Sequence, residues 1–243
     1  WATELIIVVT GVLLALVLAE WVTERREQAK TKIAIEAMNR EIAYHMIGSF
    51  RRIAAAPCLD EQISTLAQEL PKASISELRG LARQNNSLGR GNFEVFYGLP
   101  TWTYYSTARD RALRNGAFDR LSPEVAAAYA DTYRMLDLIG EQTDLERLER
   151  NELSLIAVAE SLDDNERVEL LKNTVRLDVL NNTVLNAIGR VYQFTQPLNL
   201  EPSEEDREAW RRFRAELRET RGECVLDIPL QFSGNALELI PRD

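Results

Sequence analysis

Apolar residues are concentrated in one segment near the start of the sequence and recur at helical spacing through most of the rest. Residues 5–19 read LIIVVTGVLLALVLA, and Trp21 and Val22 extend this run beyond Glu20. A helix over residues 5–22 would be about 27 Å long, close to the ~30 Å hydrocarbon core of a bilayer. The pattern therefore predicts a transmembrane helix over residues 1–23.

The residues after the run are those expected at a membrane interface, where Trp and charged side chains are enriched. They are Glu20, Trp21, Arg25 and Arg26. The positive-inside rule alone would place this basic flank in the cytoplasm. Because the sequence begins with Trp1 rather than Met, we expect further residues upstream, and that missing flank is needed to decide the orientation.

Within the run, Gly11 and Ala15 form a pair of small residues that would let another helix approach closely. One alternative to a retained anchor is a cleavable signal peptide, because Val17-Leu18-Ala19 has small residues at the spacing that signal peptidase prefers. A buried core helix is a second alternative. We favour the anchor because the helical pattern continues past Ala19 without a break.

The segment after the anchor has an apolar stripe at spacings of three and four residues, which indicates an amphipathic helix. The stripe consists of Ile35, Met38, Ile42, Met46, Ser49 and Ile53. Pro57 is expected to end this helix. We therefore predict that residues 24–56 form a stalk that continues from the anchor and lifts the next domain off the membrane surface.

Residues 57–222 are predicted to form an antiparallel helical bundle. A helix from Thr101 should end at Gly116, and the last helix should end at Gly222. Two long helices, over about 123–162 and 164–196, have a short connection and should be antiparallel neighbours. Helix starts are indicated by capping sequences at Ser74, Ser122, Asp163 and Ser203.

The buried faces of the two long helices are predicted from the same spacing. The first face contains Tyr129, Tyr133, Leu136, Gly140, Thr143, Leu148, Leu155, Ala159 and Leu162. The second face contains Val168, Leu171, Val175, Leu180, Val184, Ile188 and Val191.

Two segments depart from the helical pattern. Residues 84–100 read as a long loop, and Gly89 and Gly91 within it lack the third glycine of a phosphate-binding loop. Residues 223–243 begin with ECVLDIPLQF and are predicted to be an extended tail that packs on the bundle. The predicted fold class is all-α: a transmembrane helix and stalk, then an antiparallel bundle with a short extended C-terminal segment.

Composition excludes several function classes. The 243 residues include 29 basic and 38 acidic side chains, and a net charge of -9 argues against a nucleic-acid-binding protein. One His and two Cys are too few for most zinc, haem or iron–sulfur sites. The sequence contains none of the usual Ser-His-Asp, Cys-His or His-Glu-x-x-His arrangements. We therefore expect no catalysis, no metal and no cofactor.

Charged segments have ordinary interpretations. Residues 141–152 alternate in sign, which is typical of a solvated helix face with ion pairs. Residues 211–221 are locally basic but carry apolar positions that favour an amphipathic helix. His45, with Glu41 one turn before it, is expected to be interfacial or solvated because no further metal ligands lie at suitable spacing.

The N-terminal quarter resembles an uncharacterised family of bacterial membrane proteins with a single N-terminal span. The resemblance is carried by Glu4, Gly11, Trp21, Arg25 and Arg26, and by the APCLDEQISTL stretch after the first helix. Members commonly begin with a short basic leader. This implies a single-pass protein of the bacterial inner membrane with the bulk of the chain in the periplasm, and it implies no enzymatic activity.

Cys58 and Cys224 each lie at the boundary of a predicted element. In an oxidising periplasm, the topology implied by the resemblance, a disulfide between them could tie the tail to the stalk. The alternative is two separate buried thiols in a reducing compartment.

The function favoured by these observations is a membrane-anchored structural or interaction protein, either a homo-oligomer or an accessory subunit of a larger membrane complex. Its expected partners are the lipid bilayer and other membrane subunits or itself, and not nucleic acid. The alternative is a periplasmic sensor or ligand-binding domain on a membrane anchor. In that case the 84–100 loop and the aromatic residues Trp102, Tyr104 and Tyr105 would form the pocket.

Overall fold

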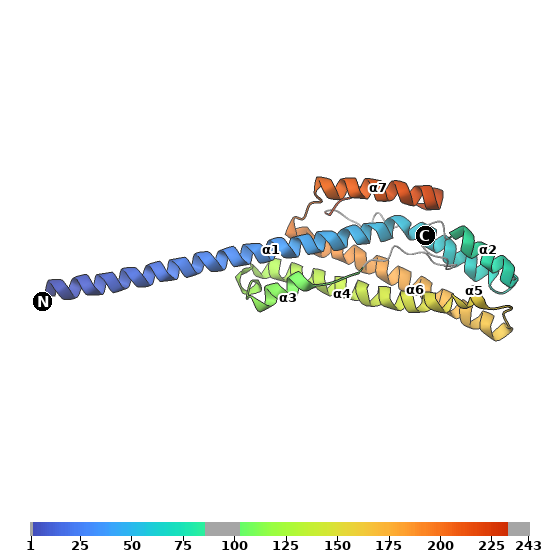
Figure 1. Cartoon of the computed structure of the whole chain (residues 1–243), viewed down its shortest axis with the longest axis horizontal. Helices are drawn as coiled ribbons and strands as arrows, with labels where there is room; N and C mark the ends of the chain where they lie inside the picture. The colour runs from blue at the N-terminus through green and yellow to red at the C-terminus, as the bar shows by residue number, and fades with distance from the viewer. Residues whose placement is uncertain (1, 86–102, 233–243) are drawn as a thin grey trace.

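The computed structural model describes residues 2–85 and 103–232, with side chains described for all of these except residues 2–6, 8 and 82–85. Within these ranges the regular secondary structure is entirely helical (Figure 1), which confirms the all-α class. The helices are α1 (Ala2–Glu69), α2 (Ile75–Asn85), α3 (Thr107–Arg114), α4 (Pro123–Glu152), α5 (Leu155–Val158), α6 (Asp164–Thr195) and α7 (Glu204–Arg221). Short 3-10 helices are η1 (Phe118–Arg120), η2 (Gln196–Leu198) and η3 (Gly222–Cys224).

The long helix α1 is continuous from the N-terminal segment into the centre of the bundle (Figure 1). Pro57 lies inside it, so the prediction that this proline ends the helix is wrong. A proline within a helix costs about 3 kcal/mol because it removes a backbone hydrogen bond and crowds the preceding turn. Its neighbours Ile53, Ala54 and Leu59 are buried, and we attribute the continuity of the helix to this packing.

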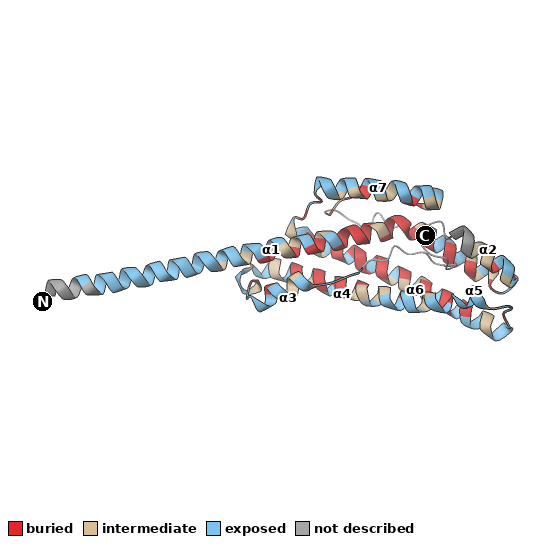
Figure 2. Ribbon diagram, viewed as in Figure 1, coloured by how far each residue is buried: buried red, intermediate tan, exposed pale blue. Residues whose placement is uncertain are grey.

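The predicted stalk does not stand free of the bundle. In Figure 2, the projecting part of α1 is exposed, and buried residues begin where the helix enters the bundle. Ala34 is the first buried position, and Met38, Ile42, Met46 and Ile53 of the predicted stripe are all fully or nearly fully buried. The helix expected to hold the domain off the membrane surface is therefore the central element of the core.

The bundle is built on the antiparallel pair α4 and α6, which pack together along most of their length as predicted. Helix α1 packs along this pair, and α7 lies on the opposite side of α1 from α4 (Figure 1). Phe50 of α1 joins the two sides, since its ring is 5.3 Å from the ring of Tyr192 and 5.6 Å from that of Trp210. The hydrophobic core is thus continuous across α1.

Local capping explains where most helices begin. The Ser122 hydroxyl accepts a hydrogen bond from Val125 N ahead of α4, and Asp163 and Ser203 form capping boxes ahead of α6 and α7. Gly116 and Gly222 follow α3 and α7 with positive φ, as a helix stop requires. These predicted boundaries are confirmed, as is the start of α2 after Ser74.

Besides the predicted helix end at Pro57, two further predicted boundaries are wrong. Helix α3 begins at Thr107 and not at Thr101, and α4 ends at Glu152 and not near Leu162. After α4 the chain turns, which buries Leu153 and Ile156. Arg79 of α2 then donates hydrogen bonds to the carbonyl oxygens of Ile156 and Ala159, at 3.1 and 2.5 Å. These tertiary contacts hold α5 in place of a continuing helix.

The predicted buried faces are only partly correct. In the first half of α6 the core positions are Leu170, Asn173, Thr174 and Leu177, whereas Val168 and Val175 are exposed on the opposite side. In the second half Val184, Ile188 and Val191 are buried as predicted. On α4, Leu148 is exposed while Ile139 and Glu146 are buried. The core at these positions contains Asn, Thr and Glu side chains. A prediction from hydrophobicity alone therefore chooses the wrong face in the first half of α6 and at Leu148 of α4.

The first part of the predicted tail packs on the bundle without regular secondary structure. After η3, Val225, Ile228, Leu230 and Phe232 are buried. Leu226 N donates to Ala54 O at 3.0 Å, close to Pro57, and Trp210 Nε1 donates to Ile228 O at 3.1 Å. Residues 225–232 therefore connect α7 to the C-terminal third of α1. The rest of the tail, from residue 233, lies outside the described residues.

The predicted transmembrane segment lies at the N-terminal end of α1, and residues 1–6 and 8 of it lie outside the described side chains. In the part of the chain that the structure describes, we find no helix long and apolar enough to cross a membrane.

Candidate functional site

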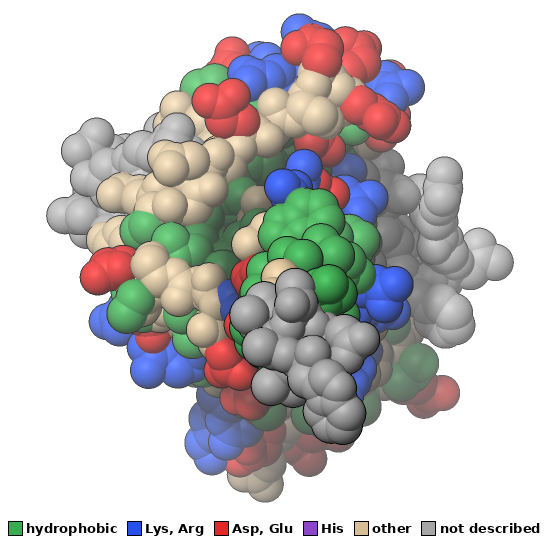
Figure 3. Space-filling model, turned by 90° about the vertical axis from the view of Figure 1, so that its left-hand side faces the viewer, with side chains coloured by type: hydrophobic (Ala, Val, Ile, Leu, Met, Phe, Trp, Pro, Cys, Tyr) green, Lys and Arg blue, Asp and Glu red, His purple; other side chains and the backbone are tan. Residues whose placement is uncertain are grey.

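The projecting part of α1 carries an apolar belt, which is a set of large apolar side chains with exposures from 39% to 67%. The belt consists of Ile7, Val9, Val12, Leu13, Leu14, Leu16, Val17, Leu18, Trp21 and Val22. Because consecutive residues lie about 100° apart on a helix, runs such as 12–14 and 16–18 place apolar groups on all sides. In the end-on view of Figure 3, apolar side chains lie in front of a bundle end that carries both acidic and basic groups.

The predicted interface residues follow the belt on the same helix. Glu20, Arg25 and Arg26 are exposed, and the Arg25 guanidinium lies over the Trp21 ring at 5.1 Å from its centroid. Gly11 and Ala15 are exposed within the belt, and no described atom lies within 4 Å of a Cβ built on Gly11. The surface around Gly11 is therefore open to another helix.

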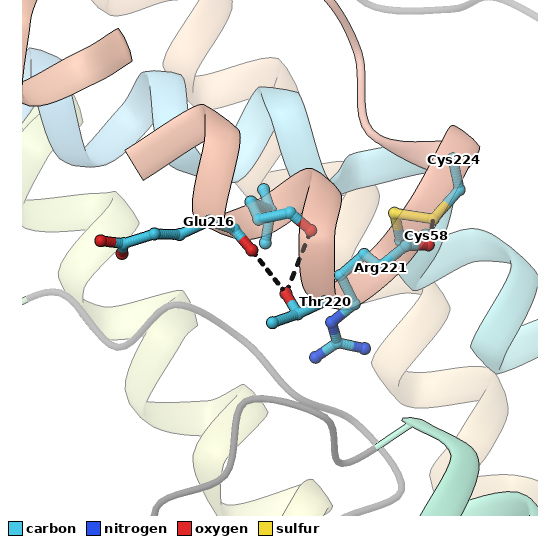
Figure 4. The surroundings of a disulfide bond; sticks show 6 residues. Cys58, Glu216, Thr220, Arg221 and Cys224 are labelled. Carbon is cyan, nitrogen blue, oxygen red and sulfur yellow. Dashed lines mark hydrogen bonds between the residues drawn. A yellow bond between two sulfur atoms is a disulfide. The ribbon is translucent and has the colours of Figure 1, made fainter. Parts of the chain in front are cut away.

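Cys58 of α1 and Cys224 of η3 are joined by a disulfide that closes a sequence separation of 166 residues (Figure 4). Cys58 is buried and follows Pro57, while Cys224 follows the glycine that ends α7. Figure 4 also shows the Thr220 hydroxyl donating to the carbonyl oxygen of Glu216 in the last turn of α7, at 3.0 Å. The disulfide therefore attaches the end of α7 and the start of the tail to α1.

Of the aromatic residues proposed as a pocket, Tyr104 and Tyr105 both contact the ring of His45 but differ in exposure. Trp102 lies outside the described residues. The Tyr104 ring stacks on the His45 ring, with centroids 5.3 Å apart, and burial raises the pKa of Tyr104 to about 12. A Cβ on Gly140 would lie 3.3 Å from Tyr104 Cβ, so α4 needs a small residue there. Tyr105, in contrast, is exposed. Tyr104 is thus packed between α1 and α4.

His45 is completely buried, and the prediction of an interfacial or solvated side chain is wrong. Its Nε2 lies 2.7 Å from Tyr105 O and, as a donor, satisfies that carbonyl. Within the described residues, Nδ1 is buried and has no hydrogen-bond partner. Protonation would place a charged N–H without an acceptor in the core, and burial accordingly lowers the pKa of His45, opposed by Tyr105 O, Glu41 and Asp137.

Glu41, one turn before His45, joins three elements. Its carboxylate accepts hydrogen bonds from the Tyr133 hydroxyl of α4 at 2.8 Å and from Ala108 N in the first turn of α3 at 2.9 Å. A carboxylate at the start of a helix is also favoured by the helix dipole. Burial and the adjacent Glu41 charge raise the pKa of Tyr133. The phenol therefore remains a donor to Glu41.

A second buried polar contact in the bundle is centred on Arg52 of α1. Its guanidinium forms a bidentate ion pair with Glu146 of α4, in which Nη1 donates to Oε2 at 2.9 Å and Nη2 donates to Oε1. It also donates to Asn181 Oδ1 of α6, at 2.6 Å from Nη2. Asn181 Nδ2 in turn donates to Asp60 Oδ1 at 2.7 Å. Glu146 is 0% exposed, so the prediction that residues 141–152 form only a solvated face is wrong at this position.

These polar side chains share one face of α1. Glu41, His45, Ser49 and Arg52 are spaced by four, four and three residues, and all are buried. In the sequence, the helical spacing of these four polar residues could have indicated that they share one face of a helix. Glu146 offers no such signal, because it is one of several acidic residues in a segment of alternating charge. Glu41, Arg52 and Glu146 are out of reach of a substrate, and the described residues contain no group of three or more possible metal ligands. The arrangement can therefore set the register between helices.

Comparisons with known proteins found no match to a family model, to a curated protein or to a solved structure.

The disulfide leads to the first prediction. Reduction should lower the free energy of unfolding by about 5 kcal/mol, because the open chain gains the entropy of a loop of this length. The measurement is urea unfolding of the oxidised and the reduced protein, followed by tryptophan fluorescence. The control is the double variant Cys58→Ala/Cys224→Ala, whose unfolding midpoint should not respond to reductant. Equal midpoints for oxidised and reduced wild type would contradict this prediction.

The Arg52–Glu146 pair leads to the second prediction. Arg52→Met and Glu146→Leu should each lower the free energy of unfolding by about 3–5 kcal/mol, because each leaves a buried partner charge uncompensated. The double variant should lose less than the sum of the two, because no unpaired charge remains. Urea unfolding of the four proteins in this cycle measures the coupling. Strictly additive losses would show that the pair is not coupled.

His45 leads to the third prediction. Its folded-state pKa lies below the unfolded value of about 6.5, so the unfolded chain binds the proton more readily. Stability should therefore fall as the pH is lowered below about 6.5. His45→Gln keeps an N–H donor but cannot titrate, and its melting temperature should fall less between pH 7.5 and pH 5.5. Parallel curves for the two proteins would exclude His45 as the cause.

Proposed function

We propose that this protein is a membrane-anchored interaction protein without catalysis of its own, whose apolar belt lies in a lipid bilayer and whose bundle lies outside it. The observation that carries the proposal is the exposure of the belt on all sides of the helix that continues into the core. A helix that is apolar all round belongs in an apolar environment. The run continues through residues 5, 6 and 8, which are also apolar.

The size of the belt favours a bilayer over water. Burying a large apolar side chain gains about 1.5–3 kcal/mol, so the ten side chains of the belt represent on the order of 20 kcal/mol. The net stability of a folded domain is about 5–15 kcal/mol. The free energy gained when the belt moves from water into hydrocarbon is therefore larger than the net stability of a typical fold, and it strongly favours insertion.

The assembly part of the proposal rests on the open surface at Gly11 and Ala15. In lipid, helices associate by close packing at small residues, and this pair is exposed on the belt. We infer that the partner is a second copy or another single-span subunit. Because α1 continues from the belt into the core, contacts made within the bilayer would also fix the position of the bundle.

The compartment is inferred from the disulfide. Structural disulfides persist in oxidising compartments such as the bacterial periplasm and are rare in the cytosol. A bond between Cys58 and Cys224 therefore supports a location of the bundle in the periplasm, attached to the inner membrane. Membership of the resembling family stays a prediction.

The sensor hypothesis receives less support from the geometry. Tyr104, one of the three residues proposed to line a pocket, is partly buried, with its ring stacked on His45 and its Cβ next to Gly140. Contacts with α1 and α4 therefore occupy much of the surface of Tyr104 that a ligand would need.

The anchor leads to the fourth prediction. Leu13→Lys/Leu16→Lys should move most of the full-length chain from the carbonate-resistant membrane pellet to the supernatant, because each charge at the centre of a span costs about 2.5–3.5 kcal/mol. The matched control is Val175→Lys/Val179→Lys, which places the same charges on exposed apolar positions of α6. The control should remain in the pellet. Equal retention of both variants would contradict the proposal.

A further inference from the structure

A second exposed apolar surface, separate from the belt, lies on helices α4 and α6. We call it the outer face; its five side chains are 46% to 58% exposed. It consists of Leu145 and Leu148 of α4 and Val168, Val175 and Val179 of α6. The leucines are spaced by three residues and the valines by seven and four, so each set forms a stripe along its helix. Contiguous apolar surfaces of this kind mark contacts with a protein or a membrane.

The α4 part of the outer face points away from α1. At about 100° per residue, Leu145 and Leu148 lie about 40° and 100° to one side of Glu149 around the helix, and Glu146 lies about 60° to the other side. Glu146 is buried against α1. Glu149 lies at the edge toward α6, where its Oε2 is 3.5 Å from Arg176 Nη1. The two leucines are therefore on the side of α4 that α1 does not cover.

The α6 part of the outer face points to the same side. Val175 and Val179 lie about 100° and 60° to one side of Arg176, whereas the buried Leu177 lies about 100° to the other side. Helices α4 and α6 are antiparallel and meet at Glu149 and Arg176. The two apolar stripes therefore lie next to each other on one surface of the bundle.

The outer face is too far from the belt to contact the same bilayer. It lies at the level of Arg52 of α1, because Arg52 pairs with Glu146 between the two leucines and Glu149. Arg52 is 30 residues beyond Val22, which is about 45 Å along the helix. A membrane that holds the belt cannot cover this surface, so a protein must.

Charges beside the outer face make it complementary to a second copy of itself. Glu152 follows Leu148 by four residues and Lys172 precedes Val175 by three, and both charged side chains are exposed. Counted from the ion pair that joins α4 and α6, Glu152 and Lys172 lie within one residue of the same level. A two-fold axis parallel to the helices would place α4 of one copy against α6 of the other at this same level. Each Glu152 would then face a Lys172, and the leucines would face the valines.

We propose that the outer face is the contact between two parallel copies of this chain, in which α4 and α6 of each copy form a four-helix arrangement. This inference names the partner in the proposed function and rests on it for the orientation, because only parallel copies can insert both belts into one bilayer. The contact covers the half of α4 and α6 far from the belt. Arg134 and Arg190 lie at one level nearer the belt, where like charges end the contact.

The first test measures the dimer of the full chain in mild detergent by native mass spectrometry over a range of concentrations. The wild type should be dimeric. Val175→Glu/Val179→Glu should raise the dimer dissociation constant by about tenfold or more, because it brings acids to an apolar contact beside Glu152. The matched control is Ile33→Glu/Leu113→Glu, which makes the same change at exposed apolar positions outside the outer face and should dimerise like wild type.

The second test checks the parallel arrangement by oxidative cross-linking of two co-expressed copies with different tags. One copy carries Leu148→Cys and the other Val175→Cys, and the native cysteines stay in their disulfide. The two tags should become joined several-fold more than when Leu148→Cys is paired with Leu113→Cys on α3. Cross-linking no greater than in this control pair would overturn the parallel contact.

A wild type that is monomeric at all concentrations, or a dimer that survives Val175→Glu/Val179→Glu, would overturn the inference. A variant that loses stability while its mass stays that of the wild type would do the same, since the outer face would then be covered by the chain itself. Carbonate extraction separates these outcomes from failure of the proposed function: a chain that is extracted but still cross-links overturns the anchor and leaves this contact in place. Far-UV circular dichroism of each variant confirms that the bundle is folded.

Discussion

The Arg52 guanidinium donates hydrogen bonds to Glu146 on α4 and to Asn181 on α6 in a buried site, and the register of the bundle depends on these bonds. An apolar core tolerates small sliding of one helix along another, whereas a bidentate ion pair in a low-dielectric interior does not. Glu41 imposes the same constraint nearer the belt, where it bonds to Tyr133 and Ala108. Two polar contacts about three turns apart on α1 thus fix its rotation and its axial position.

On the side of α1 that faces α7, a disulfide and a backbone hydrogen bond attach the tail to the helix. The Cys58–Cys224 bond and the Leu226 N–H to Ala54 O bond attach the end of α7 and residues 225–232 close to Pro57. A proline-containing helix with one side in water would be free to kink there. With α6 on one side and α7 and the tail on the other, the residues before and after Pro57 are buried, and the helix continues to Glu69.

The sequence predicts those parts of the fold that local chemistry decides. Ser122, Asp163 and Ser203 mark the helix starts because a cap needs only its own following turn. The burial of Glu146 could not be predicted, because its local pattern is that of a solvated face and its partner is 94 residues away. Val175 shows the converse error. A valine at helical spacing predicts a core position, but Val175 is exposed, and the buried face of α6 carries Asn173 and Thr174 instead.

The continuity of α1 also determines how the projecting segment and the bundle are coupled. Arg120 at the end of the bundle bonds to Glu24, and burial on α1 begins at Ala34, about 18 Å beyond Val22 along the helix axis. Residues 12–47 contain neither Gly nor Pro, and sharp kinks in helices almost always occur at such residues. No glycine or proline therefore separates this part of the belt from Glu41 and His45. If a partner rotates or shifts the belt, the polar contacts of the core must either move with it as a unit or break.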